Sequence, residues 1–182
     1  EMDTVLGCEG SHKVLLTFHF SECSFMMAYL LDSKESDHIK NVFDSIEHAI
    51  GTFSFASAFS LILTDRGGEF QIPDALECGE DNLIRTSIYY CDPMYSWQKP
   101  HCEKNHEYIR KICPKGTSFD DYSQKDINLM MSHINSTPRQ SLGGLPPIAQ
   151  AKIMLPHELL NFFALTEIPA DEIVLTPALL KK

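Results

Sequence analysis

Three acidic side chains stand where carboxylates could bind metal ions: Asp3, Asp65 and Glu103. Asp65 directly follows an apolar run at residues 59–64, and ligand sites in open α/β sheets form beyond the carboxyl ends of such strands. Asp3 lies in the apolar run at residues 2–6, and Glu103 lies near the start of a stretch with helical periodicity. If these elements are neighbours, the three carboxylates suit hard divalent cations that prefer oxygen ligands, chiefly Mg²⁺ or Mn²⁺.

Each of these acids also has a purely structural explanation. An Asp in a turn such as the one at residues 65–68 can bond its own downstream backbone. Asp3 can be a solvated residue, and Glu103 can interact with the positive end of a helix dipole. Residue type alone favours these structural roles. For Glu69 and Asp92 we likewise predict solvated or capping roles rather than metal binding.

The acids must be positioned by a mixed set of strands and helices. Short runs rich in apolar and aromatic residues predict strands at residues 2–6, 12–20, 24–31, 59–64 and 84–91. Apolar residues at helical spacing predict helices at residues 39–50, 101–113 and after Ser123. Ser33 or Ser36 is the expected N-cap of the first helix, and Ser123 starts a capping box with Asp126. This order predicts an α/β domain whose sheet begins antiparallel and continues parallel.

Length and composition agree with one packed domain. The chain has 182 residues, of which 43% are apolar. Its longest stretch without an Asp, Glu, Lys or Arg side chain covers residues 48–64, which is shorter than the roughly 20 apolar residues of a membrane-spanning helix. Six cysteines are scattered without a CxxC pair, so we expect small buried side chains rather than disulfides or a zinc site. We therefore predict a soluble cytoplasmic protein that does not contact a membrane.

The charge is distributed unevenly along the chain. A net charge of −10 argues against nucleic-acid binding through the whole surface. Residues 97–115, however, hold five basic and two acidic side chains, whereas residues 1–96 hold 5 basic and 16 acidic ones. The segment that contains Glu103 is thus the one basic strip in an acidic protein.

Several motifs resemble one family of enzymes. They are Met2-Asp3-Thr4-Val5-Leu6-Gly7, Leu63-Thr64-Asp65-Arg66-Gly67-Gly68-Glu69-Phe70, the segment at residues 91–99, Glu103-Lys104-Asn105-His106, Pro114-Lys115-Gly116, and Asn135, Pro138, Arg139, Leu142 and Gly143. In order and spacing they resemble the Asp-Asp-Glu transposases, specifically the bacterial insertion-sequence-thirty family, and the likeness covers almost the whole chain. Two departures are Arg66, where many members have Asn, and Pro100-His101-Cys102, where a Gly-containing approach to the catalytic helix is usual.

The resemblance implies a single catalytic core over residues 1–182. Its expected fold is ribonuclease H-like, of the retroviral integrase type, with helices flanking a five-stranded mixed sheet and a helical extension from about residue 140. The family's N-terminal DNA-binding region is expected to be missing from this chain. Asp3, Asp65 and Glu103 are implied as catalytic residues that bind two Mg²⁺ or Mn²⁺ ions, with Asp3 bridging both.

The resemblance also implies a reaction and partners. The reaction is metal-dependent DNA cleavage and strand transfer on transposon ends and target DNA, carried out by a homo-oligomer at the bacterial nucleoid. Two alternatives stay open. One is a ribonuclease H-like nuclease that cuts without joining, and the other is an inactive, transposase-derived protein that only binds DNA.

One face of the predicted catalytic helix is a candidate DNA contact. Glu103, His106, Glu107 and Arg110 share this face through their i, i+3, i+4 and i+7 spacing. We predict that the cationic side chains on and around it hold DNA phosphates: Lys99, Lys104, His106, Arg110, Lys111 and Lys115. The alternative for each lysine is an ordinary solvated helix face.

Overall fold

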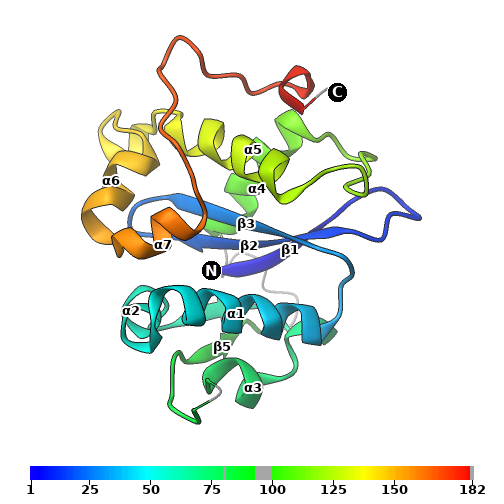
Figure 1. The fold of residues 1–182 in the computed structure, drawn as a ribbon. Helices are drawn as coiled ribbons and strands as arrows, with labels where there is room; N and C mark the ends of the chain where they lie inside the picture. The colour runs from blue at the N-terminus through cyan, green and yellow to red at the C-terminus, as the bar shows by residue number, and fades with distance from the viewer. Residues whose placement is uncertain (80, 93–99, 181–182) are drawn as a thin grey trace.

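The computed structural model describes residues 1–79, 81–92 and 100–180, and leaves the side chains of residues 100–103 outside the description. Within this range a small antiparallel sheet lies between two layers of helices (Figure 1). The α/β class predicted from the order of elements is confirmed.

The antiparallel sheet consists of β1 (Met2–Leu6), β2 (Val14–Phe20) and β3 (Phe25–Leu31), in the order β1-β2-β3. Every residue of β2 from Val14 to His19 is buried, as expected for a central strand with helices on both faces. Side chains alternate across the strand, so Leu16 and Phe18 enter one hydrophobic core while Leu15 enters the other. The register places Asp3 of β1 directly opposite Thr17 of β2.

A second, parallel pair of strands completes the strand set. It consists of β4 (Ile62–Thr64) and β5 (Ile88–Tyr90). β4 lies beside β1, but no backbone ladder joins the two strands in the described part of the chain. The structure therefore has a three-stranded and a two-stranded sheet where we expected one five-stranded sheet.

The strand predicted at residues 59–64 is shorter than expected because a helix occupies the preceding residues. α2 (Thr52–Ala58) was not predicted, and the amide of Phe59 still donates to the Phe55 carbonyl at its end. The Phe55 and Phe59 rings pack 4.8 Å apart in the core, so the first residue of the predicted strand packs against the helix before it. A similar shortening leaves only Ile88–Tyr90 of the strand predicted at residues 84–91.

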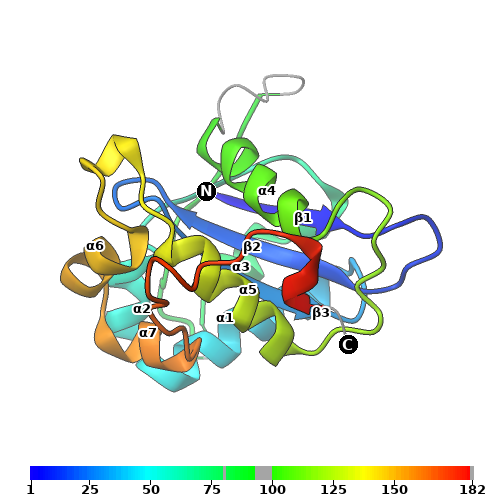
Figure 2. The ribbon, with the colours of Figure 1, turned by 90° about the horizontal axis from the view of Figure 1, so that it is seen from above.

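Helices cover both faces of the antiparallel sheet. One face carries α4 (Pro100–Ile112) and α5 (Gln124–Ser136), and the other carries α1 (Ser36–Ile50) and α2 (Figures 1 and 2). The remaining helical elements are α3 (Pro73–Glu77), α6 (Pro147–Met154), α7 (His157–Phe162) and the 3₁₀ turns η1 (Gly68–Phe70), η3 (Gln140–Leu142) and η4 (Pro177–Leu180). None of the helices in the described ranges has the length and apolar composition to cross a bilayer.

The helix ends test the predicted caps. At α5 the capping box is confirmed, because Ser123 and Asp126 bond each other's backbone amides reciprocally. At α1 neither Ser33 nor Ser36 is the N-cap. Glu35 takes that position without a side-chain cap, because the Ser33 hydroxyl lies 3.3 Å from the His38 ring and Ser36 is already helical.

A buried arginine, not foreseen from the sequence, ties α1 to the region before β5. Arg85 is fully buried and donates to the carboxylates of Asp44 and Glu47 at 2.7 and 2.8 Å. Its other nitrogens donate to the carbonyls of Leu76 and Ala75, both at 2.9 Å. The guanidinium is thus satisfied on every nitrogen, as a buried charge requires.

The cysteines partly follow the prediction of small buried side chains. Cys23, Cys91 and Cys113 are buried, whereas Cys8 and Cys78 are half-buried, and all five carry free thiols. Burial raises the pKa of the Cys113 thiol to about 11, so this thiol stays protonated and unreactive at neutral pH.

Candidate active site

Asp3 lies in the middle of β1, on the face of the sheet that α4 covers. Its strand partner Thr17 is fully buried, and the Thr17 hydroxyl donates to the Asp3 carbonyl at 3.1 Å. The Asp3 carboxylate accepts the amide of Thr4 at 2.8 Å through Oδ1. Asp3 is itself half-buried, which leaves part of its carboxylate accessible.

α4 is fastened to this part of the sheet by two side chains. His106 Nε2 lies 3.0 Å from the Thr17 hydroxyl oxygen. Because that hydroxyl donates its single proton to the Asp3 carbonyl, its oxygen can accept a bond from His106 N–H. One turn later, Arg110 Nη2 donates to the Leu6 carbonyl at 2.9 Å. α4 therefore runs along β1, with its first turn over the beginning of the strand (Figure 2).

Asp65 follows β4 in a tight turn. Its Oδ1 accepts the Gly67 amide at 2.8 Å, which is the local bonding expected of an Asp in a turn. Gly67 is needed here, because a Cβ atom at this position would lie 3.0 Å from Asp65 Oδ1 and 2.6 Å from Glu69 Oε2. The carboxylates of Asp65 and Glu69 thus both lie next to the position that a Cβ atom of residue 67 would occupy.

Glu69 is the residue that the sequence interpretation placed wrongly. It is neither solvated nor a cap, since it is 5% exposed and its Oε1 accepts the Thr4 hydroxyl at 2.9 Å and pairs with Lys34 at 3.0 Å. Thr4 is the neighbour of Asp3, and Glu69 belongs to the turn of Asp65. The Thr4–Glu69 bond therefore joins β1 to the loop after β4 at the point where no ladder connects the strands. A buried Glu four residues after a turn Asp gives no sequence signal that separates it from a solvated one.

Glu103 lies in the first turns of α4, and its side chain falls outside the described residues. Among the described residues no three His, Cys, Asp or Glu side chains form a metal-binding group. The structure thus brings the elements of Asp3 and Asp65 together and lays α4 across the same face. Assignment of the three carboxylates as one metal site stays a prediction.

The predicted DNA-contacting side chains divide into two groups. Lys104, Lys111 and Lys115 are exposed, while His106 and Arg110 are half-buried and engaged with the sheet as described above. Lys99 lies outside the described residues. A surface hollow of about 530 Å³ is lined by five residues of this strip: His106, Glu107, Arg110, Lys111 and Lys115. Four of the five can carry positive charge, so the hollow suits an anion.

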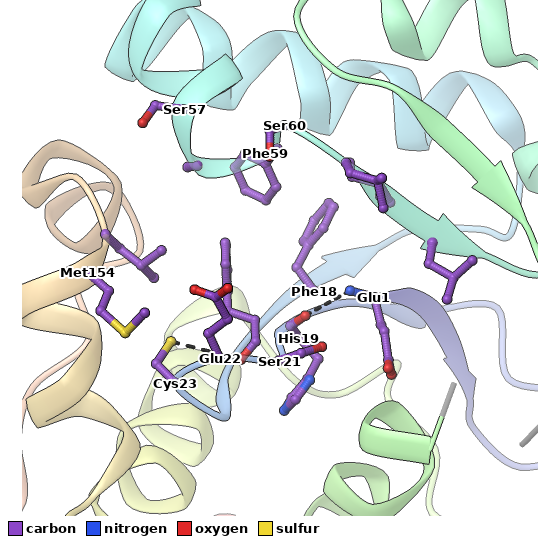
Figure 3. A pocket seen from close by; sticks show the side chains of 16 residues that line it. Glu1, Phe18, His19, Ser21, Glu22, Cys23, Ser57, Phe59, Ser60 and Met154 are labelled. Carbon is purple, nitrogen blue, oxygen red and sulfur yellow. Dashed lines mark hydrogen bonds between the residues drawn. The ribbon is translucent and has the colours of Figure 1, made fainter. Parts of the chain in front are cut away.

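A different hollow, of about 480 Å³, lies at the far end of β2 (Figure 3). Phe18 and Phe59, whose rings pack against each other 5.3 Å apart, line it together, with Met154 of α6 at its edge. Neither Asp3 nor Asp65 lines it. This hollow, whose lining mixes polar and apolar side chains, is therefore not part of the candidate metal site.

Comparison with known proteins confirms the resemblance to insertion-sequence transposases. The chain is 26% identical over 166 residues to the transposase for insertion sequence element IS4351 of Bacteroides fragilis, which covers 89% of this chain and 47% of that protein. It is 28% identical over 142 residues to the putative integrase ORF3 of Spiroplasma virus SpV1-R8A2 B, covering 78% of this chain and 42% of that protein.

A shorter match reaches the subgroup suggested by the motifs. Transposase InsI of insertion sequence element IS30A of Escherichia coli strain K12 is 34% identical over 55 residues, or 30% of this chain and 14% of that protein. The chain thus spans about half the length, or less, of the curated relatives that it matches. No protein-family model matches the chain.

Proposed function

We propose that this chain is the catalytic core of a transposase that cleaves DNA and joins the cut end to a target. The observation that carries the proposal is the meeting of β1, the turn after β4 and α4, which bear Asp3, Asp65 and Glu103. Relatives named transposase and integrase over most of the chain support it. The fold we propose is ribonuclease H-like, with β4 and β5 extending the antiparallel sheet beyond β1.

The donor set suits a pair of divalent cations. Asp3, Asp65 and Glu103 would hold them through carboxylate oxygens, the ligands that Mg²⁺ and Mn²⁺ prefer. When bound, such ions supply Lewis acidity for the attacking and leaving oxygens of an in-line displacement at phosphorus. Asp3 and Asp65 fit this role because both residues are half-buried rather than fully enclosed.

The other residues of the site position these acids. The Thr4–Glu69 bond fixes the distance between the backbone segments that carry Asp3 and Asp65. His106 and Arg110 fix α4 against β1 and so fix the placement of the helix turn that holds Glu103. In this proposal the exposed Lys111 and Lys115 hold DNA phosphates beside the acids.

Metal binding and DNA chemistry test the proposal together. We expect Mn²⁺ binding to the 182-residue chain by isothermal titration calorimetry, and Mn²⁺-dependent nicking of plasmid DNA. Glu103→Gln keeps the side-chain shape but removes one charge, so it should weaken Mn²⁺ binding at least about tenfold and abolish nicking. Glu158→Gln is the matched control, since it removes the same charge from an exposed helical position, on α7, that lines neither the basic hollow nor the candidate site, and it should change neither.

The possible outcomes separate the candidate functions. Nicking together with insertion of a labelled duplex end into plasmid identifies a transposase. Nicking without insertion identifies a nuclease, and DNA binding without either reaction identifies an inactive relative. Unchanged nicking or Mn²⁺ affinity in Glu103→Gln would remove Glu103 from the site.

A further inference from the structure

We call the hollow lined by residues 106, 107, 110, 111 and 115 the basic hollow. Another hollow borders α4 on the side away from it, and its wall contains a buried arginine. It has a volume of about 780 Å³ and lies between three segments: the β2–β3 turn, α4 and the chain after α5. Nine of its eleven lining residues have polar or charged side chains; the lining comprises Ser21, Glu22, Ser24, Lys104, Asn105, Tyr108, Pro138, Arg139, Gln140, Ser141 and Leu142.

Only 7% of the Arg139 surface is exposed, yet some of its guanidinium N–H groups have no hydrogen-bond acceptor. Nη2 makes two long bonds, to Asn105 Oδ1 at 3.4 Å and to the Ile134 carbonyl at 3.3 Å. Nε and Nη1 have no hydrogen-bond acceptor, and these two nitrogens carry three of the five N–H donors. Arg85, by contrast, is equally enclosed but satisfied on all three nitrogens.

A buried cation with unused donors needs a compensating partner. Besides the two long bonds of Nη2, the Tyr108 ring lies 3.6 Å from the guanidinium carbon, and no carboxylate pairs with Arg139 in the described part of the chain. Burial also lowers the pKa of Arg139 from its ordinary value, because the charged guanidinium is removed from water. A guanidinium nonetheless stays protonated in proteins, so the positive charge persists at the wall of the hollow.

The rim of the hollow adds charge and donors that an anion could reach. Lys104 is exposed at the rim and makes no ion pair in the described part of the chain. Gln140 and Ser141, also exposed, offer an amide and a hydroxyl. Glu22 is the one acid in the lining, so the two cations outnumber it. A cleft with low-dielectric walls strengthens the field of such charges at its mouth.

Resting on the proposed function, we infer that this hollow is a second DNA phosphate site, with Lys104 touching a phosphodiester and Arg139 supplying charge from the wall. The helix between this hollow and the basic hollow is about 10–12 Å across with its side chains. The major groove of B-DNA is about 12 Å wide, so phosphates of the two strands that border it match a pair of sites on opposite sides of α4.

DNA binding by rim variants tests the second site. Lys104→Gln removes the reachable cation, and Ser141→Asp places a negative charge at the rim without touching the buried arginine. Each should weaken binding of a short duplex by roughly tenfold at about 50 mM salt and lower the salt slope by about 1, because one phosphate contact is lost. Lys125→Gln, the same change at an exposed lysine of α5 outside the hollow, should leave affinity and slope unchanged.

Arg139→Gln should cause a similar loss if it folds, as judged by circular dichroism, and the rim variants decide the question if it does not. Lys111→Gln in the basic hollow reports separately on the proposed function. Loss of affinity in Lys111→Gln but not in Lys104→Gln or Ser141→Asp overturns the second site and leaves the proposed function standing. A wild-type chain that binds no duplex at low salt overturns the second site and the DNA contact of the proposed function together.

Discussion

The bond between Thr4 and Glu69 should determine how firmly β1 is held to the turn after β4, a junction that we call the seam between β1 and β4. It should also determine how tightly the proposed site binds metal ions. Thr4→Val keeps the shape of the side chain but removes the donor. Glu69 is 5% exposed, so its carboxylate then keeps only Lys34 as a side-chain partner among the described residues. Hydrogen bonds to charged groups contribute about 1.5–3 kcal/mol, and we expect Thr4→Val to lower the free energy of unfolding by that amount.

Glu69→Ala removes the same bond and the ion pair with Lys34. The Lys34 side chain is 41% exposed, so solvent screens this pair and it adds no more than about 1 kcal/mol. The expected total is therefore about 2–4 kcal/mol. Because both substitutions delete one shared bond, the double variant should be little less stable than Glu69→Ala alone, with a coupling energy of about 1.5 kcal/mol or more.

Urea denaturation of the four proteins measures this cycle, with Lys34→Gln as the control for the ion pair. Calorimetry with Mn²⁺ supplies the functional readout, since a looser seam should weaken metal binding in Thr4→Val and Glu69→Ala alike. Strictly additive losses of stability would show that Thr4 and Glu69 are not coupled. Unchanged Mn²⁺ affinity would show that the bond does not position Asp3 and Asp65.

Two further predictions concern the rest of the fold. Arg85→Met should lower the free energy of unfolding, measured by urea denaturation, by about 3–5 kcal/mol, because it leaves Asp44 and Glu47 without their buried cation. Adding Asp44→Asn and Glu47→Gln should restore most of this loss. A triple variant no more stable than Arg85→Met would contradict this account. The backbone amides of Lys13 and His12 and the hydroxyl of Ser11 donate to Asp120 and lower the pKa of its carboxyl group. The stability that these bonds give the folded protein is therefore present above the unfolded-state pKa of about 3.9 and is lost as the pH falls through the lower pKa of the folded state. The melting temperature of Asp120→Asn should therefore fall less than that of wild type between about pH 5 and pH 2.5, and an exposed control, Asp171→Asn, should follow wild type.

The sequence predicted a helix or strand well where its apolar residues follow one clear periodicity or where a capping motif marks its start. β1 occupies the expected residues 2–6, and the capping box begins α5 after Ser123 as expected. α2 was missed because its seven residues hold alternating aromatic and small side chains, a pattern that also fits a strand. Such short helices are decided by packing against the core, here of Phe55 on Phe43, rather than by local preference.

The candidate site was predictable only in part, for a similar reason. The residue types of Asp3 and Asp65 alone favoured structural roles, and only the resemblance to Asp-Asp-Glu transposases made a metal site the preferred interpretation, which stays a prediction. The supporting bonds were not predictable, because Thr4–Glu69 spans 65 positions and His106–Thr17 spans 89. Nor does composition distinguish Arg85, which is neutralised, from Arg139, which is not. That difference arises entirely from which acids the fold brings near each arginine.

The seam between β1 and β4 also has a consequence for the order of folding. The β1-β2-β3 meander is made of neighbouring segments, so its contacts close short loops at little entropic cost. The turn of Asp65 and the helix of Glu103 come from much later in the sequence and must dock onto an existing strand. Contacts of long sequence separation form slowly, so the acids assemble only after most of the chain has collapsed. A partly folded chain would thus carry the meander without the proposed metal site, and the proposed DNA chemistry would become possible only in the last steps of folding.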